Sequence, residues 1–452
     1  MAFDTTSYEQ LSADVVRMAL DRGATGAECT VAEGEEFSAS VRMREIEQLK
    51  QAGSRAAGLR VLVGGCTGSA YTSDLSLDGL RRMVASAVDN ARITTEDPHA
   101  GLPDPADLGR HELNLGIYND DVAALDPELK IRWAKEAEAA ALDADARITN
   151  SEGAGFDSNL GARYFSNSLG FTGSYRTSSC SMSAVPVARQ GETMERDYWY
   201  TVARSASRLE PAAEVGRRAA ERVLRRLGAR KVPTQKAPIV FEPRTARSLL
   251  GHIFEAVDGD SVYRQASFLA ASLGERVAAE GVTLIDDGTL PGLFGTSPFD
   301  DEGVPTRRTL VIENGVLKSF LHNSYTARKL GMRTTGNASR GLSGNASVDH
   351  GNLFLEPGGK TPGDIIQSIR AGLLVTELLG QGVNTVTGDY SRGAAGVWIE
   401  NGEIAYPVSE ITIAGNLKQM LRDIEAIGND LEFRGSVASP TLLIREMTIS
   451  GN

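Results

Sequence analysis

The sequence predicts an α+β protein: an N-terminal antiparallel sheet with helices, a β-rich middle region and a large, mostly-β C-terminal domain. Short runs of alternating apolar and polar residues recur along the chain and are typical of strands. Glycine is frequent, at 48 of 452 residues, which favours turns and β-structure over long helical bundles. A few segments with helical spacing of apolar residues separate these runs.

Length and shifts in composition predict the domain organisation. A chain of 452 residues is expected to form two or three domains. We expect an N-terminal α+β domain over residues 1–95, a Pro-, Asp- and Gly-rich linker over 96–125, a middle α+β region over 126–230 and a C-terminal β-rich domain over 235–452.

The N-terminal domain is expected to begin with a helix over 7–22 and to end with a helix that starts at Ser76 or Asp78 and runs to about Arg92. Between these helices, glycine or acidic turns separate the alternating runs. They predict short antiparallel strands over 27–32, 36–42, 46–50, 57–63 and 66–71.

The middle region is expected to open with a helix at Asp126-Pro127, because proline is favoured at the first helical position. Residues 147–204 are β-rich, with a hairpin near Gln190-Gly191. A helix from Pro211 to Leu227 then carries several arginines on its outer side. This basic face has two interpretations, a nucleic-acid surface or a solvated face, and the acidic chain as a whole favours the second.

The C-terminal domain is expected to contain an amphipathic helix over Thr245–Asp260, stopped by Gly259, and a second helix over 261–273. Two Asn-Gly turns, at 314–315 and 401–402, predict hairpins. The glycine-rich segment 331–351 has no periodicity and is expected to be functional or mobile. A capped helix is expected at 361–364, and a last helix from Asn416 to Gly428.

The polar face of the Thr245 helix is the main candidate site. Ser248, His252 and Glu255 lie opposite its apolar residues. His252 and Glu255 are three residues apart, a spacing that can place two ligands on one metal ion, with His322 or His350 as a third. A histidine on such a face is more often simply solvated. Ser391 lacks the Gly-x-Ser-x-Gly context of a nucleophile and an assignable His partner.

Composition argues against several classes of protein. A net charge of −12 and a pI near 5.1 disfavour nucleic acid or an anionic membrane as the main partner. Cys29, Cys66 and Cys180 are far apart and form no CxxC, so a reducing compartment fits best. The N-terminus does not resemble a signal peptide, and no run approaches the roughly 20 apolar residues of a membrane span. We therefore expect a cytoplasmic protein.

The chain resembles the TldD/PmbA family of peptidase subunits. The resemblance rests on LLGHIFEAVDGDSVYRQASF (249–268), GVTLIDDGTLPG (281–292), the N-terminal edge of the 331–351 segment, GDYSRGAAGVWIENGEIAYPVSEITIAGNL (388–417) and AIGND (426–430). In the TldD branch, a helix carries His-Glu-x-x-x-His and a C-terminal cysteine adds a zinc ligand. Here Leu250, Gly251 and Glu255 stand at the motif positions, and no cysteine follows Cys180. The segments GDYSRGAAG (388–396) and YPVSEITIAGN (406–416) resemble the PmbA (TldE) branch, which lacks the motif.

The resemblance implies a non-catalytic subunit with no catalytic residue, metal ligand or cofactor of its own. Zinc is expected in a TldD-type partner, and the pair would degrade or trim unstructured peptides held as an added strand. The expected peptide-binding or vestigial site comprises His252, Glu255, Asp260, Arg264, His322 and Arg392. The chain is expected to form a heterodimer with that partner or a homodimer. Two alternatives stay open: a self-standing peptidase with an atypical metal site, and a non-proteolytic homodimeric peptide-binding or scaffold protein.

Overall fold

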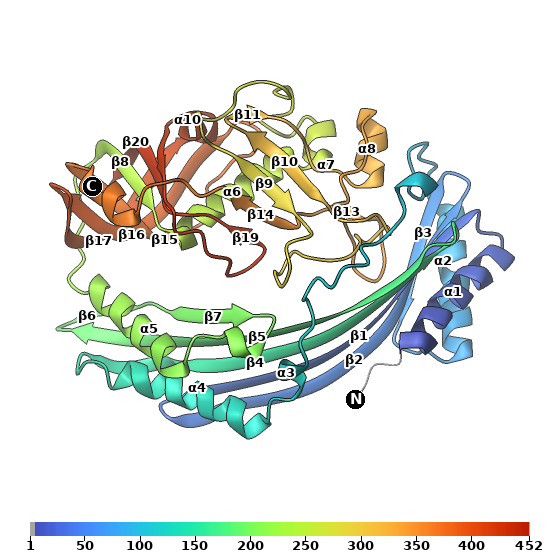
Figure 1. The fold of residues 1–452 in the computed structure, drawn as a ribbon, viewed down its shortest axis with the longest axis horizontal. Helices are drawn as coiled ribbons and strands as arrows, with labels where there is room; N and C mark the ends of the chain where they lie inside the picture. The colour runs from blue at the N-terminus through green and yellow to red at the C-terminus, as the bar shows by residue number, and fades with distance from the viewer. Residues whose placement is uncertain (1–4, 452) are drawn as a thin grey trace.

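The computed structural model describes residues 5–451, and its parts are arranged in layers (Figure 1). A long antiparallel sheet runs beneath the C-terminal domain, and helices cover the other side of that sheet. The predicted α+β class is confirmed, with strands dominating the middle region and the C-terminal domain. Residues 1–4, where the predicted N-terminal domain begins, lie outside the described part.

The N-terminal and middle regions share one seven-stranded sheet, with the order β3-β2-β1-β4-β5-β6 and with β7 paired to β5. The two regions meet where β1 pairs antiparallel with β4, from Glu28 opposite Asn167 to Val41 opposite Ala154. The strands are β1 (Gly26–Arg42), β2 (Glu45–Val63), β3 (Cys66–Thr72), β4 (Ile148–Asn167), β5 (Thr172–Gln190), β6 (Thr193–Arg196) and β7 (Trp199–Ala203).

The five short strands predicted for the N-terminal domain are wrong in their number and lengths, because β1 and β2 are continuous. The expected breaks fall on acidic and glycine residues that the sheet accommodates. Gly34, for example, is paired with Ser54 on one side and Gly161 on the other. Strands on both sides of such a residue pair with its backbone N–H and C=O groups. A prediction from local strand propensity does not take these neighbouring strands into account.

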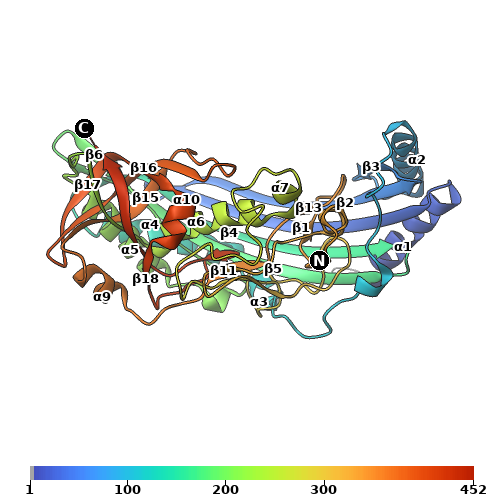
Figure 2. The same ribbon diagram turned by 90° about the horizontal axis from the view of Figure 1, so that it is seen from above.

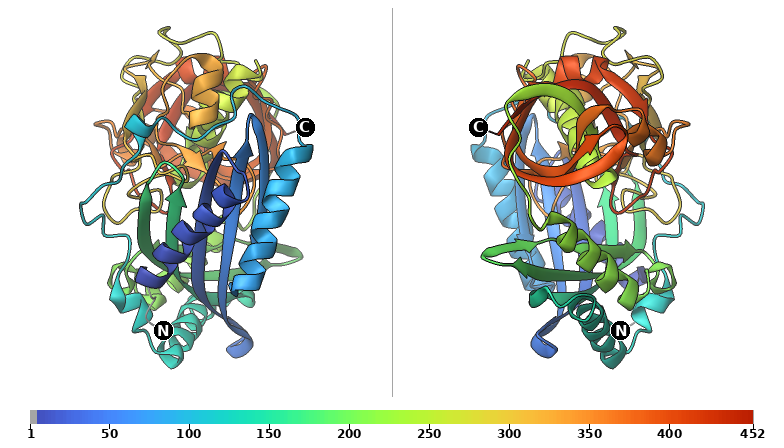
Figure 3. Two further views of the ribbon diagram at one scale, coloured as in Figure 1. Left: turned by 90° about the vertical axis from the view of Figure 1, so that its right-hand side faces the viewer. Right: turned by 90° about the vertical axis from the view of Figure 1, so that its left-hand side faces the viewer.

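Four long helices pack on one face of this sheet, α1 and α2 at one end and α4 and α5 at the other (Figures 1 and 3). Cys29 and Val31 of β1 lie in the first cluster, and Phe37 and Ala39 lie in the second. Alternate residues of a strand share a face, so both helix pairs cover the same face. The helices on this side are α1 (Thr5–Asp21), α2 (Leu77–Ile93), α3 (Asp120–Ala123), α4 (Pro127–Leu142) and α5 (Ala212–Arg226). Short 3₁₀ turns occur at Ala206–Arg208 and at Pro105–Asp107, where Asp107 pairs with Arg333 of the C-terminal domain.

The helix starts follow their local sequence. Ser76 caps α2 by accepting a hydrogen bond from the Gly79 N–H, and Asp126 caps α4 ahead of Pro127. Both starts were predicted and are confirmed. They depend on residues within one turn of the helix end.

The opposite face of the sheet supports the C-terminal domain. Glu28 of β1 is buried there between Arg60 of β2, at 2.8 Å, and Arg340 of the 331–351 segment. The 331–351 segment is therefore docked on the sheet, and it contains the short paired strands β12 (Ala338–Ser339) and β13 (Ser347–Val348). The segment therefore has secondary structure of its own, because β12 and β13 pair with each other, and it contacts β1 through Arg340 and β2 through Leu342.

The C-terminal domain contains a barrel and a second sheet. In the first sheet, the order β17-β16-β15-β8-β20-β18 is closed by pairing of β17 with β20, which appears as a ring in the right-hand view of Figure 3. Its strands are β8 (Gln235–Phe241), β15 (Ala371–Leu379), β16 (Asp389–Glu400), β17 (Glu403–Asn416), β18 (Ile424–Ile427) and β20 (Leu442–Ser450). The second sheet contains β9 (Leu284–Asp287), β10 (Arg308–Glu313), β11 (Val316–Leu317), β14 (Asn352–Leu355) and β19 (Val437–Ala438).

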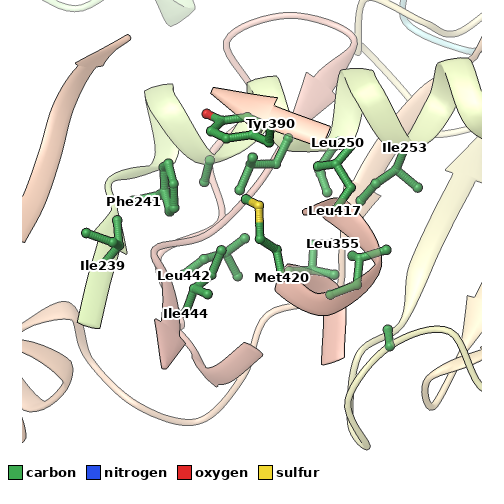
Figure 4. Packing of buried hydrophobic residues seen from close by; sticks show 14 of the residues in the cluster. Ile239, Phe241, Leu250, Ile253, Leu355, Tyr390, Leu417, Met420, Leu442 and Ile444 are labelled. Carbon is green, nitrogen blue, oxygen red and sulfur yellow. The ribbon is translucent and has the colours of Figure 1, made fainter. Parts of the chain in front are cut away.

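Helix α6 (Pro243–Val257) is central to this domain. Its buried residues Leu250 and Ile253 pack with Leu355 of the second sheet and with Met420 and Ile444 from the barrel side (Figure 4). Figure 2 shows α6 from above, among the strands of the domain. The remaining helices are α7 (Gly259–Tyr263), α8 (Ser324–Leu330), α9 (Pro362–Gln367) and α10 (Leu417–Arg422).

Three helix boundaries in this domain differ from the prediction. Gly259 does not end α6 but begins α7, with Asp258 as the cap between them. The helix expected over 261–273 ends at Tyr263, followed by Gln265 with φ 56°. The last helix ends at Arg422, and Ile424–Ile427 forms a strand paired with β20. An apolar run of this length suits a helix or a strand, and its pairing partner decides which one forms.

The turn predictions are confirmed. Asn314-Gly315 has φ values of 46° and 80°, and Asn401-Gly402 has 49° and 82°, as a two-residue turn with both central residues left-handed requires. Thr361 and Asp364 form a capping box at the start of α9. Within residues 5–451, no helix is long and apolar enough to cross a membrane.

Candidate functional site

The site centres on the polar face of α6, where His252 and Glu255 meet β16. The Nδ1 atom of His252 lies 3.7 Å from Oε2 of Glu255, too far for a hydrogen bond. The His252 side chain is only 13% exposed, and neither ring nitrogen has a hydrogen-bond partner among the described residues. The expectation of a solvated histidine is therefore wrong. Burial follows from the packing of β16 against this face of the helix.

Tyr390 and Arg392 are the β16 residues at this site. The Tyr390 ring lies edge-on to His252, with 6.3 Å between ring centroids. Burial raises the pKa of the Tyr390 hydroxyl, and the nearby Arg392 only partly offsets that effect. The two residues are separated by one position on a strand, so they share a face. Tyr390 was not among the predicted site residues. The sequence signal that could have found it is its position two residues before Arg392 on the same strand, which places both side chains on one face.

Burial favours the neutral form of His252. Burial lowers the pKa of His252, the carboxylate of Glu255 raises it, and the charge of Arg392 lowers it again, so that it lies below its ordinary value. Thr385 donates a hydrogen bond to Glu255 Oε2 at 3.4 Å. The site therefore presents a neutral imidazole, one carboxylate and one guanidinium. Such groups suit hydrogen bonding to a peptide backbone or side chain.

Asp260 and Arg264 lie elsewhere. Asp260 of α7 forms an ion pair at 2.8 Å with Arg264, the residue directly after the helix, and both line a cavity of about 380 Å³ between the C-terminal domain and the long sheet. Arg60 of β2 and Asn345 of the 331–351 segment line the same cavity. Burial raises the pKa of neighbouring Asp258 to about 6, and the charge of Asp260 adds to this effect.

His322 is buried behind α7. It is 1% exposed, its Nδ1 lies 3.2 Å from Thr326 Oγ1, and burial lowers its pKa to about 4. A side chain at position 259 would overlap the His322 ring, so Gly259 allows this close packing. His350 packs edge-on against Phe254 instead. Neither histidine joins His252 and Glu255, and no group of three His, Cys, Asp or Glu side chains suited to a metal occurs within residues 5–451.

A second cavity, of about 590 Å³, was not predicted from the sequence. It lies between the middle region and loops of the C-terminal domain, and Arg204, Arg208, Phe294 and Arg434 are among its lining residues. Arg204 is held by backbone carbonyl groups of Ser178, Leu293 and Phe294. These residues come from distant segments with no shared motif, so the sequence offered no signal for this cavity.

Family models match most of the chain. The model for the PmbA/TldA metallopeptidase C-terminal domain matches residues 234–451, that for the central domain matches 120–227, and that for domain 1 matches 27–91. The chain belongs to the PmbA/TldA metallopeptidase family. It is 42% identical over 426 residues to Metalloprotease PmbA of Escherichia coli O157:H7, covering 94% of this chain and 92% of that protein. Identity to the Metalloprotease PmbA homolog of Haemophilus influenzae is 38% over 440 residues, covering 97% and 94%. The resemblance to the PmbA branch is therefore confirmed.

Solved structures of the family share the whole fold. A protein from Bacteroides thetaiotaomicron, described as a proposed modulator of DNA gyrase, is 30% identical with a TM-score of 0.93, and the match covers 100% of both chains. TldE from Thermococcus kodakarensis is 22% identical with a TM-score of 0.87, covering 98% of this chain and 100% of that one. The second match shows the fold alone.

A catalytic metal does not fit the residues of α6. Leu250, at the first position of the family's zinc motif, is 2% exposed and packs in the hydrophobic core. Gly251 offers no side-chain donor. His252 and Glu255 are the remaining donors, and two donors are fewer than the three protein ligands of a catalytic zinc site.

Proposed function

We propose that this chain is the non-catalytic, peptide-binding subunit of a cytoplasmic metallopeptidase complex that degrades or trims unstructured peptides. A TldD-type chain is its partner and carries the zinc ion. The observation that carries the proposal is the apolar, fully packed Leu250 at the first motif position, in a chain that otherwise keeps the family fold. A helix that had kept catalysis would present a donor there.

The polar face of α6 supports a role in peptide binding. His252, Glu255 and Arg392 lie together on it. Neutral imidazole and charged groups side by side can pair with both the amide groups and the charged ends of a peptide. The three cysteines are free, in keeping with a reducing compartment.

The test is zinc content together with peptide cleavage. The purified chain, a purified TldD-type subunit and their mixture are analysed for metal and for cleavage of an unstructured peptide, with a chelator control. We expect less than about a tenth of an equivalent of zinc in this chain, and more cleavage in the mixture than with either chain alone.

Two results would overturn the proposal. One is near-stoichiometric metal in the isolated chain that is lost in His252→Ala or Glu255→Gln. The other is chelator-sensitive cleavage by the isolated chain. An unchanged rate on mixing, with no complex formed, would exclude the role as a subunit.

A further inference from the structure

The cavity of about 590 Å³ between the middle region and the C-terminal domain contains a cation without a counter-ion. Arg204 directly follows β7, and its side chain lines this cavity. Within residues 5–451, no carboxylate forms an ion pair with its guanidinium group. Burial lowers the pKa of Arg204, and only the nearby Tyr175 acts in the other direction. Because burying an unpaired charge costs free energy, an anion in the cavity would stabilise Arg204.

Arg204 has donors left for such an anion. Its Nε, Nη1 and Nη2 atoms each donate one hydrogen bond, to the carbonyl groups of Leu293 at 3.4 Å, Ser178 at 3.2 Å and Phe294 at 3.0 Å. A guanidinium group has five N–H donors, so two remain. Two parallel N–H groups match the two oxygen atoms of a carboxylate. The three carbonyl groups also fix the side chain in place, which reduces the entropy lost on binding.

A second arginine at this cavity has no partner among the described side chains. Arg208 ends the 3₁₀ turn Ala206–Arg208, is exposed, and lines the same cavity. The third arginine of the lining, Arg434, pairs with Glu210 at 2.6 Å and with Glu432 at 2.7 Å. These two glutamates are the acidic residues of the lining. The cavity therefore keeps an excess of positive charge, although the whole chain has a net charge of −12.

The apolar part of the lining indicates which anion fits. Leu293, Phe294 and Phe433 line the cavity together with the arginines. The volume lies within the range of about 300–1,000 Å³ of pockets that bind organic ligands. A doubly charged phosphate would be repelled more strongly by Glu210 and Glu432 than a singly charged carboxylate. A carboxylate attached to an apolar group is therefore complementary to both parts of the lining.

We propose that this cavity binds the C-terminal carboxylate of a peptide through Arg204 and Arg208, with the apolar side chain of the last residue against Phe294 and Phe433. A chain end can enter from solvent, because the lining includes the exposed residues Ser207, Arg208, Pro291 and Glu432. The inference rests on the proposed peptide-binding function and adds to it that the free end of the peptide is recognised.

The first test compares two peptides that differ only at their last group. An unstructured peptide that ends in phenylalanine carries a fluorophore at its N-terminus, and its C-terminus is either a free acid or an amide. Fluorescence anisotropy measures binding to the full chain without a partner. We expect the amide to bind about tenfold more weakly, because it lacks the charge-assisted hydrogen bonds. Equal binding of the two peptides, or no binding of either, would overturn the proposal.

A competitor distinguishes the two sources of an apolar carboxylate. N-acetylphenylalanine has the same terminal group as the peptide but no preceding chain. We expect it to displace the free-acid peptide only at concentrations well above those at which the unlabelled peptide does so. Displacement at equal concentrations would assign the cavity to small carboxylic acids and would overturn the assignment to a peptide end.

The second test locates the carboxylate. Arg208→Gln should weaken binding of the free-acid peptide toward that of the amide and leave the amide unchanged. The matched control is Arg132→Gln on α4, an exposed arginine that also has no ion pair within residues 5–451. Arg204→Gln should remove the preference for the acid, with folding checked by circular dichroism because Arg204 also holds two loop carbonyl groups. If that variant does not fold, Arg208→Gln decides. A folded Arg208→Gln variant with an undiminished preference for the acid would overturn the proposal.

These outcomes are separate from those that test the proposed function, because no zinc or cleavage is measured. Equal binding of acid and amide would remove the C-terminal subsite and leave the peptide-binding subunit in place. A preference for the acid that is lost in Arg208→Gln, in a chain that does not promote cleavage by a TldD-type partner, would support the subsite and contradict the proposed function.

Discussion

Arg222 of α5 donates a hydrogen bond to Glu242, the residue directly before α6, with 3.0 Å between Nη2 and Oε1. Its Nε also lies 3.3 Å from Asp197 Oδ2. The helix layer and the C-terminal domain are thus joined by a buried charge cluster. The arginine face of α5 is therefore not uniformly solvated, because Arg226 also turns inward to Glu195 and Glu377. Arginines committed to internal ion pairs are not free to contact phosphates.

Arg222→Met is expected to lower the free energy of unfolding by about 3 kcal/mol, because it removes the nearest cation from two buried carboxylates and leaves them only the more distant Arg225 and Arg244. The side chains of Arg222, Glu242 and Asp197 are 11%, 15% and 6% exposed. Urea unfolding followed by tryptophan fluorescence measures the change, since Trp199 lies beside Arg222. The control is Arg217→Met, whose partner Glu214 is on the solvent side, and little change is expected. Equal effects of the two variants would contradict the prediction.

Gly58→Ala is expected to loosen the 331–351 segment. A methyl group at Gly58 would overlap the backbone carbonyl of Leu342, so the segment must move away from β2. Limited proteolysis and hydrogen exchange of residues 331–351 should show faster cleavage and exchange. Gly53→Ala on the same strand is the matched control, because its nearest neighbour, Gly34 O, would be 3.9 Å away. Unchanged protection in Gly58→Ala would show that the segment does not depend on this contact.

Asp258→Asn is expected to change how stability depends on pH. Burial raises the Asp258 pKa from 3.8 to about 6, so the folded protein binds this proton more tightly than the unfolded chain. The stability that the protonated Asp258 contributes is fully present below the pKa of the unfolded chain, 3.8, and is lost as pH rises through the folded pKa of about 6. The variant should therefore gain stability relative to the native protein between pH 4 and pH 7, measured by thermal midpoints across pH. Asparagine keeps the cap on the Asp260 N–H.

Asp145→Asn is the control of opposite sign. The hydrogen bonds from Arg147 lower the Asp145 pKa from 3.8 to about 2. Its contribution to stability is present above the unfolded value and is lost as pH falls through about 2. The variant should therefore lose stability relative to the native protein at neutral pH but not in strong acid. Parallel pH profiles for the Asp258 and Asp145 variants would contradict both assignments.

Arg392→Gln is expected to raise the pKa of His252, because it removes a cation that disfavours the imidazolium form. Glu255→Gln should lower the same pKa, because it removes the stabilising carboxylate. Histidine-selective NMR titration measures both shifts, and the chain has only 5 histidines to assign. A His252→Gln spectrum identifies the resonance. Shifts in the same direction for both variants would show that the two charges do not act on His252 as the geometry indicates.

Features that depend on neighbours in the chain were predictable from the sequence. The Asn401-Gly402 turn, the Ser76 and Asp126 caps and the capping box at Thr361 all form as expected, because each is satisfied within a few residues. The amphipathic character of α6 also follows from its spacing of apolar residues. Family membership and the missing zinc motif could likewise be recognised from short sequence motifs.

The tertiary structure alone decided which distant residues meet. It merged the first two regions into one sheet through pairing of β1 with β4, more than a hundred residues apart. In the folded chain, His252, Glu255 and Arg392 lie together. Asp260 and Arg264 line a separate cavity, and His322 is buried against Gly259. Burial and strand pairing set these outcomes, and both depend on what the rest of the chain brings alongside a residue. The sequence by itself determined the local elements and the family, whereas the assembly of the site required the complete fold.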